Sequence, residues 1–226
     1  MIAPIVAAEN KDIAFIISLA GPVNGYSTLM YQIVAPLQRS HAGEQLIAFE
    51  LTTEHILLDN ILTATDSAAF LQAVGRDYRS YYAGIPDSIR PQYPFAPNPD
   101  QYIALLAPKA GGLVAPWWKF FVGYKASSYY SKVYCPVLLL GGDKDVSVSN
   151  ATDMIAIAGI LKDHKDQNVE THLMPGLNHL FQHCQTCTPQ EYGRLAETFS
   201  PEVLNIMATW LDKNISRPPA NFDPRH

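Results

Sequence analysis

Three short runs of apolar and β-branched residues alternate with helical patterns, and this alternation restricts the fold more than any other feature of the chain. The runs are Ile13–Ala20, Pro136–Leu140 and Val169–Met174, and Gly21-Pro22 and Gly141-Gly142 end the first two. Continuous apolar runs are typical of strands covered on both faces of a parallel sheet. Periodicity and capping residues predict helices over 2–10, 24–40 and 150–164, and a last helix starting at Ser200-Pro201. The sequence therefore predicts an α/β fold with a parallel sheet and right-handed crossovers.

The alternation is interrupted between residues 42 and 128. Amphipathic helical stretches come first, and the segment from Gly84 to Pro116 then holds seven prolines. We expect 42–128 to form an inserted, mostly helical cap, and 1–41 together with 129–215 to form the core around the sheet. Residues 216–226 include three prolines and few apolar side chains, which predicts a loose tail.

Charge and hydropathy exclude several functional classes. The 16 basic and 21 acidic residues give a net charge of -5 without a basic run, which argues against a nucleic-acid partner. No apolar stretch approaches the roughly 20 residues needed to span a bilayer, so no membrane is expected as a partner. Met1–Ala8 lacks a basic stretch and is followed by Glu9, so it does not resemble a signal peptide. The compartment stays unknown, with the cytoplasm as the default expectation.

Two loops carry residues suited to acid–base chemistry. Gly141-Gly-Asp-Lys-Asp145 follows the second apolar run, and Pro175-Gly-Leu-Asn-His179 follows the third. Functional groups of parallel sheets collect beyond the carboxyl ends of the strands, and the spacing from Asp145 to His179 fits one strand–helix–strand unit. If the two strands are neighbours, the carboxylate can accept a hydrogen bond from one imidazole nitrogen and leave the other free as a base.

Each of these residues also has a structural interpretation. An aspartate after two glycines is commonly a turn residue or a helix cap, and a loop histidine is commonly structural. Asp143 could also take the role given to Asp145. The order of acid and histidine at two strand ends is what favours a catalytic pair, and we expect such a pair to need no cofactor.

The loops resemble those of the α/β-hydrolase family, in particular bacterial esterase-like and acyl-peptidase-like members. Gly142-Asp-Lys-Asp145-Val-Ser-Val resembles the family's acid loop, and Met174-Pro-Gly-Leu-Asn-His179-Leu-Phe-Gln resembles its histidine loop. Residues 2–8 and 14–22 resemble the helix and strand that follow the nucleophile. The resemblance implies the C-terminal part of a hydrolase sheet with a lid at 42–128. It also implies a serine hydrolase acting on carboxylic esters or related acyl substrates, with Asp145 and His179 as catalytic residues.

The family's nucleophile motif is missing from the chain. Gly-x-Ser-x-Gly does not occur, and the nearest segment, Gly25-Tyr-Ser27-Thr-Leu29, lacks the second glycine and a preceding strand. By the resemblance, the serine would lie roughly four residues before Met1, and this chain alone would be inactive. The apolar run at 13–20 would then lie near an open sheet edge.

Two further interpretations stay open. The chain could be a non-catalytic α/β-hydrolase-like domain or remnant that associates with a partner through its exposed sheet edge. Separately, His183-Cys184-Gln-Thr-Cys187 has a spacing that fits two zinc ligands or a redox dithiol, although no second ligand pair follows. The alternative for this segment is a surface loop before a helix that starts at Thr188-Pro189. The three cysteines do not predict a disulfide framework.

Overall fold

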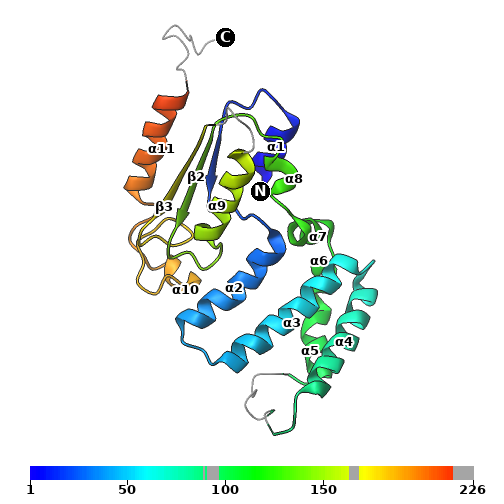
Figure 1. The fold of residues 1–226 in the computed structure, drawn as a ribbon. Helices are drawn as coiled ribbons and strands as arrows, with labels where there is room; N and C mark the ends of the chain where they lie inside the picture. The colour runs from blue at the N-terminus through cyan, green and yellow to red at the C-terminus, as the bar shows by residue number, and fades with distance from the viewer. Residues whose placement is uncertain (89, 91–96, 163–167, 216–226) are drawn as a thin grey trace. The chain divides into compact units, whose positions relative to one another are not determined.

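The chain folds as a mixed α/β protein with a small parallel sheet, in a computed structural model that describes residues 1–88, 90, 97–162 and 168–215 (Figure 1). It divides into two compact units. The sheet unit comprises Met1–Val23 and Lys125–His226, and the helical unit comprises Asn24–Tyr124. The tail expected at 216–226 lies outside the described residues.

Within the described residues the sheet has three parallel strands in the order β1-β2-β3, which confirms the predicted α/β class with a parallel sheet. Strand β1 is Ile16–Leu19, β2 is Val137–Gly142 and β3 is Val169–Met174. Strand β1 begins three residues later than the apolar run that predicted it. Since β2 and β3 are adjacent and parallel, the two loops that follow them leave the same edge of the sheet.

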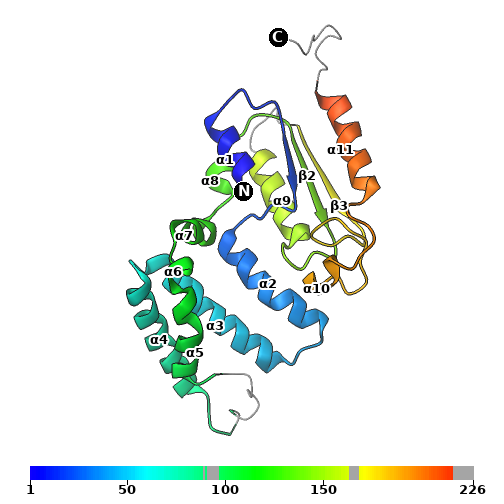
Figure 2. The same cartoon turned by 180° about the vertical axis from the view of Figure 1, so that it is seen from behind.

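Strand β2 is the centre of the core, and all six of its residues are buried. Leu138 and Leu140 belong to an apolar cluster with Val203 and Trp210 of helix α11, Pro201–Asn214. Helix α9, Asn150–Lys162, packs along β2 and β3 (Figures 1 and 2). Helix α1, Ile2–Glu9, contacts β1 and the short helix α8, Ser127–Tyr130. The predicted positions 163 and 164 of the helix at 150–164 lie outside the described residues.

The helical unit contains helices that start at well-defined caps. The side chains of Asn24, Asp66 and Asn98 each accept a backbone N–H at the start of α2, α4 and α5. The helices are α2 Gly25–Arg39, α3 Glu44–Thr63, α4 Ser67–Gly84, α5 Pro99–Leu106, the 3-10 turn η2 Ala107–Lys109, α6 Ala110–Leu113 and α7 Pro116–Gly123. Within the described ranges, no helix combines the length and apolar character needed to cross a membrane.

Helix α2 belongs to the helical unit, whereas the sequence placed residues 24–41 with the sheet core. The reason is packing, because α2 contacts α3 and α7. A Cβ at Gly25 would lie 1.7 Å from the carbonyl oxygen of Phe121, so glycine is what allows α2 to approach α7 this closely. The helical unit therefore begins at Asn24 instead of 42 and ends at Tyr124 instead of 128.

Candidate active site

Asp145 lies in the loop between β2 and α9, and its side chain is fully buried. Its Oδ1 atom accepts the backbone N–H groups of Ser147 at 2.6 Å and Val148 at 2.9 Å. Its Oδ2 atom accepts Nδ2 of Asn150, the first residue of α9, at 2.8 Å. These donors replace the water that burial removes, and they fix the carboxyl group in one orientation.

His179 lies in the loop after β3, and its Nδ1 is 2.8 Å from Oδ2 of Asp145. A carboxylate can only accept, so Nδ1 is the donor of this bond, and in a neutral imidazole Nε2 is then the nitrogen with the free lone pair. The imidazole is one-third exposed, whereas the carboxylate is not exposed at all. The structure therefore brings together the two predicted site residues in the arrangement of a general base and the carboxylate that orients it. Their catalytic roles stay predictions.

The two glycines at the end of β2 make room for the site. A Cβ at Gly142 would lie 2.1 Å from the carbonyl oxygen of Leu177, in the loop that carries His179. A Cβ at Gly141 would lie 2.4 Å from Cγ of Asn150, the residue that binds Asp145. The sequence analysis used Gly141 and Gly142 only as a strand end. Their close contacts explain why side chains larger than hydrogen would disturb both site loops.

A buried amide network holds the loop on either side of His179. The side chain of Asn178 accepts the N–H groups of Leu180 at 2.9 Å and Gln182 at 3.0 Å, and its Nδ2 donates to Oε1 of Gln182. Gln182 in turn donates to the carbonyl oxygen of Glu197 at 2.8 Å. Leu177 and His183 form an isolated antiparallel bridge at the base of the loop. We call residues 177–183 the histidine loop.

Asp143, the competing candidate for the acid, has different partners. Its Oδ1 accepts the backbone N–H of Gly176 at 2.7 Å, and its Oδ2 forms an ion pair with Lys144 at 3.1 Å. We call residues 143–149, between β2 and α9, the acid loop. Asp143 thus connects the acid loop to the segment before the histidine loop. Within the described residues, the side-chain hydrogen bond of His179 goes to Asp145 and not to Asp143.

Ser27, in the segment nearest to the nucleophile motif, is part of a helix cap. Its backbone N–H donates to Oδ1 of Asn24, and its hydroxyl donates to the carbonyl oxygen of the same residue. This is the ordinary arrangement of a serine in the first turn of a helix. It lies on α2 in the helical unit, not on a strand-to-helix turn of the sheet.

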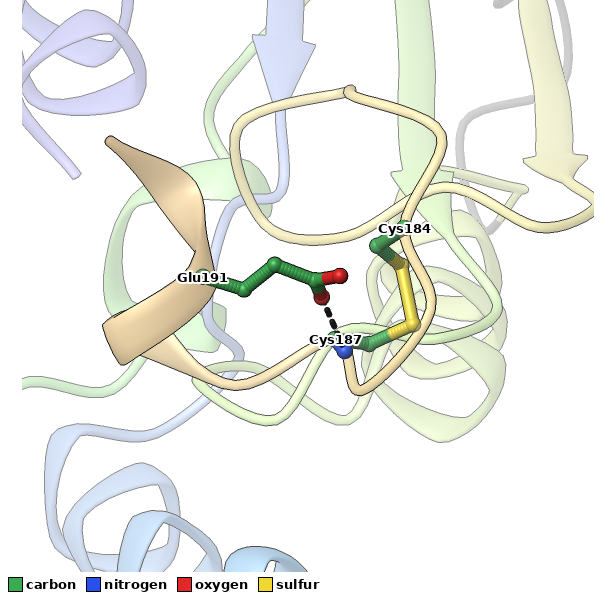
Figure 3. Close-up of side chains that lie close together, drawn as sticks. All are labelled: Cys184, Cys187 and Glu191. Atoms are coloured by element: carbon green, nitrogen blue, oxygen red, sulfur yellow. Dashed lines mark hydrogen bonds between the residues drawn. A yellow bond between two sulfur atoms is a disulfide. The ribbon is translucent and has the colours of Figure 1, made fainter. Parts of the chain in front are cut away.

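Cys184 and Cys187 are joined by a disulfide, which the sequence did not predict (Figure 3). The bond closes a loop of two residues, Gln185 and Thr186. The two sulfur atoms and a Glu191 carboxylate oxygen lie within 4.8 Å of one another, the grouping expected of a metal site. In the disulfide, however, neither sulfur is a thiolate, and only thiolates bind zinc strongly. The dithiol interpretation therefore agrees with the structure better than the zinc interpretation does.

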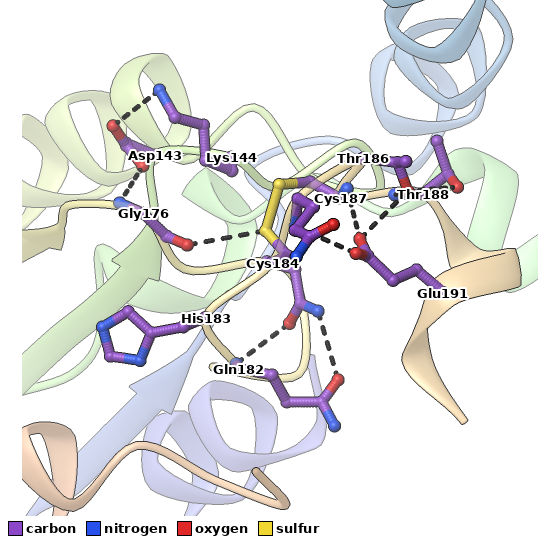
Figure 4. The surroundings of a disulfide bond; sticks show 12 residues. Asp143, Lys144, Gly176, Gln182, His183, Cys184, Thr186, Cys187, Thr188 and Glu191 are labelled. Carbon is purple, nitrogen blue, oxygen red and sulfur yellow. Dashed lines mark hydrogen bonds and ion pairs between the residues drawn. A yellow bond between two sulfur atoms is a disulfide. The ribbon is translucent and has the colours of Figure 1, made fainter. Parts of the chain in front are cut away.

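Glu191 stabilises the loop that contains the disulfide. Its carboxylate accepts the N–H groups of Gln185 at 3.0 Å and Cys187 at 2.7 Å, and the hydroxyl of Thr186 at 3.0 Å (Figures 3 and 4). Glu191 lies on the four-residue helix α10, Pro189–Tyr192. The predicted helix start at Thr188-Pro189 is confirmed.

Sequence reasoning missed the residues that support the pair. The side chain of Asn150, at the start of α9, binds Asp145, and nothing in the sequence indicated this bond. The buried network of Asn178 and Gln182 had one visible signal, which is the presence of two amide side chains that flank a candidate histidine. Amide side chains are common in loops, so this signal alone does not predict a buried network.

Comparison with known proteins gives this chain no family. A scan against protein-family models finds no match, and a search of curated proteins finds no relative. The geometry of the site is therefore the basis for a functional assignment.

Proposed function

We propose that this chain carries the acid and the base of a serine hydrolase that acts on carboxylic esters or related acyl substrates. In this proposal the sheet unit is the C-terminal part of an α/β-hydrolase sheet, and the helical unit is the cap inserted into it. Asp145 orients His179, and His179 removes the proton from a serine that attacks the acyl carbon. Water then releases the acyl group with the same histidine as base.

The observation that carries the proposal is the bond between His179 Nδ1 and Asp145 Oδ2. The buried carboxylate of Asp145 accepts four hydrogen bonds. The one from His179 uses Nδ1, so Nε2 of this partly exposed imidazole stays available as a base. A purely structural aspartate would be satisfied by the three donors of its own loop and helix. The fourth donor comes from a different strand end, as a triad requires.

The nucleophile is not explained by the described residues. The 226-residue sequence has no Gly-x-Ser-x-Gly, and within the described part His179 has no serine or cysteine side chain as a hydrogen-bond partner. The proposal therefore includes a serine supplied by a segment outside these 226 residues. We expect the isolated chain to hydrolyse activated esters no faster than its His179→Ala variant.

The test begins with the coding sequence directly upstream of the Met1 codon. An in-frame Gly-x-Ser-x-Gly is expected there, and the extended protein should hydrolyse p-nitrophenyl esters. In the extended protein, His179→Ala should lower kcat by roughly 10³-fold or more, and Asp145→Asn should also lower it strongly. Asp143→Asn is the matched control, because Asp143 lies two residues from Asp145 and its carboxylate binds Gly176 and Lys144, whereas the hydrogen bond of the imidazole goes to Asp145.

Three results would contradict the proposal. The first is an upstream region without such a motif. The second is an extended protein whose esterase activity is unaffected by His179→Ala. The third is a burst of product from the 226-residue chain alone, because that would require a nucleophile within it.

A second candidate function, a non-catalytic domain that associates through the edge of its sheet, is favoured by strand β1. The N–H groups of Ile16 and Ala20 donate to carbonyl oxygens of Pro136 and Leu140. Since residues alternate along a strand, the backbone groups of Ile17 and Leu19 face away from β2. Within the described residues no strand pairs with that side of β1. Such an edge can accept a strand from a partner.

Sedimentation velocity of the purified chain tests this candidate. If the edge mediates association, Leu19→Lys should shift the chain toward the monomer, because a charged edge side chain opposes strand addition. Leu204→Lys is the control, since Leu204 is similarly exposed but lies on α11. A wild-type chain that is monomeric at all concentrations would rule out self-association through β1.

A further inference from the structure

We propose that the Cys184–Cys187 disulfide is a redox-sensitive site, reduced by a dithiol and reformed by oxidation, that controls how firmly the histidine loop is held. The proposal goes beyond the hydrolase function and does not depend on it. Its basis is the position of the disulfide directly after the histidine loop, together with the contacts that link it to both site loops (Figure 4).

The disulfide is poorly placed to act as a stabilising crosslink. The stabilisation from restricting the unfolded chain grows with the length of the closed loop, and here the bonded residues are three positions apart. Both cysteines also lie in one surface segment and connect no separate elements. A bond that restricts the unfolded chain so little is better explained by a local function.

The two cysteine residues differ in burial, and this difference sets the order of reaction in the proposal. Cys184 is half-buried, whereas Cys187 is 3% exposed. A reductant thiolate therefore attacks Sγ of Cys184, forms a mixed disulfide and releases Cys187 as the thiolate. The second thiol of the reductant then attacks the mixed disulfide and releases Cys184. The dithiol supplies both electrons and becomes a cyclic disulfide, and the two cysteines gain the two protons.

The disulfide directly follows the histidine loop, and it is linked to the loop of Asp145 through Gly176. Sγ of Cys184 lies 3.5 Å from the carbonyl oxygen of Gly176, and the N–H of Gly176 donates to Asp143 in the acid loop. The residue before Cys184, His183, forms the bridge with Leu177 that closes the histidine loop. The contacts thus connect the disulfide through Gly176 to Asp143, two positions before Asp145.

Reduction changes the contact between Cys184 and Gly176 and the restraint on the backbone of Cys187. A disulfide sulfur has no proton, whereas the thiol of reduced Cys184 can donate a hydrogen bond to the carbonyl oxygen of Gly176. Cys187 has a φ of +59°, a conformation that costs free energy for a residue with a Cβ. The disulfide and Glu191 hold it there, so loss of the disulfide removes one of the two restraints. The two redox states therefore differ in their interactions, which is the requirement for a switch.

The experiment uses the purified 226-residue chain in buffers with graded ratios of reduced to oxidised dithiothreitol, without denaturant. Thiols are trapped by alkylation and located by peptide mass spectrometry, with Cys135 as an internal thiol reference. Hydrogen exchange is then compared between the oxidised and reduced chains. We expect reversible reduction of Cys184 and Cys187 in the folded protein. Exchange should become roughly tenfold faster in peptides covering 177–188 and stay unchanged in the β2 peptide.

Two variants sharpen the result. The double variant Cys184→Ser with Cys187→Ser should exchange like the reduced wild type under both redox conditions. Cys135→Ser is the matched control and should still respond to dithiothreitol. If the double variant does not fold, the reduced and reoxidised wild-type chain supplies the same comparison.

Two outcomes would overturn the proposal. One is a disulfide that is reduced only when the chain is unfolded by denaturant, which would make it a structural crosslink. The other is complete reduction without faster exchange in 177–183, which would separate the redox change from the histidine loop. Neither readout requires catalysis, so this test can fail while the hydrolase proposal stands, and the reverse also holds.

Discussion

Gly142 and Leu177 are in such close contact that no side chain fits between them. A Cβ on Gly142 would lie 2.1 Å from the carbonyl oxygen of Leu177, and the same oxygen accepts the N–H of Lys144 at 3.0 Å. The end of β2, the acid loop and the histidine loop therefore meet at one carbonyl group. The loops of Asp145 and His179 are thus held together next to this contact.

Gly142→Ala should destabilise the protein, because the new methyl group must displace the backbone of the histidine loop. We expect the free energy of unfolding to fall by about 1–3 kcal/mol, as is typical of overpacking at a site that cannot relax. Urea unfolding followed by circular dichroism measures the change. Gly159→Ala is the control, since a Cβ there meets no atom within 4 Å on helix α9. It should be neutral or stabilising by up to about 1 kcal/mol.

Asp145→Ala and His179→Ala should have unequal effects on stability. The first leaves the buried N–H of Val148 and one of the two Nδ2 hydrogens of Asn150 without an acceptor, since Asn150 keeps its bond to the carbonyl oxygen of Gly142. We expect a loss of roughly 2–4 kcal/mol. The second leaves Asp145 with three donors, and the imidazole was already one-third exposed. We expect a loss of about 1 kcal/mol or less. Equal losses in thermal or urea unfolding would contradict this account of the pair.

The stability of the protein should fall as the pH rises through the range set by Glu54 on α3. Burial raises the pKa of Glu54 from 4.5 to about 7, and repulsion from the Glu50 carboxylate adds to the effect. The folded chain thus holds a proton that the unfolded chain releases, so the free energy of unfolding decreases between pH 4.5 and about 7. Glu54→Gln should flatten this dependence, as measured by urea unfolding across that range. Glu9→Gln, at an exposed position on α1, should leave it unchanged.

Glu197 should contribute a dependence of opposite sign. The backbone N–H of His183 donates to its carboxylate at 2.6 Å and the imidazole of His183 lies at 2.9 Å, and both hydrogen bonds lower the pKa of Glu197. Its contribution is complete above the ordinary pKa of about 4.5 and is lost as the pH falls through the lowered value. Glu197→Gln should therefore be less stable than wild type at pH 7, with the difference shrinking toward pH 3. A constant difference would show that the carboxylate charge is not involved.

Much of the sheet unit could be predicted from the sequence because its signals are local. The third strand begins and ends at the predicted residues, and the helix at Pro201 begins where its serine–proline pair indicated. The closeness of Asp145 and His179 followed from one rule about parallel strands, and it needed only that β2 and β3 be neighbours.

The rest depended on contacts that sequence periodicity does not encode. Helix α2 has an ordinary amphipathic pattern, and its packing against α3 and α7, including the close approach of Gly25 to Phe121, is what assigns it to the helical unit. The bond from Asn150 to Asp145 joins a helix start to a loop, and neither periodicity nor a motif in the sequence indicates it. The spacing of Cys184 and Cys187 was compatible with a redox dithiol, a zinc site and a plain surface loop, and only the structure shows that the two cysteines are bonded.

The order of the strands has a consequence for how the chain folds. Ile16 of β1 pairs with Val137, 121 positions later, whereas Val137 pairs with Val169 after only 32. Closing the longer loop costs about 1 kcal/mol more in chain entropy, unless the intervening segment has already become compact. During synthesis β1 leaves the ribosome long before β2, so the two strands cannot pair until the residues between them have been made. Early folding of Asn24–Tyr124 would make the segment between the two strands compact and so lower the entropy cost of pairing β1 with β2. The helical unit would then contribute to the folding of the sheet as well as to the finished structure.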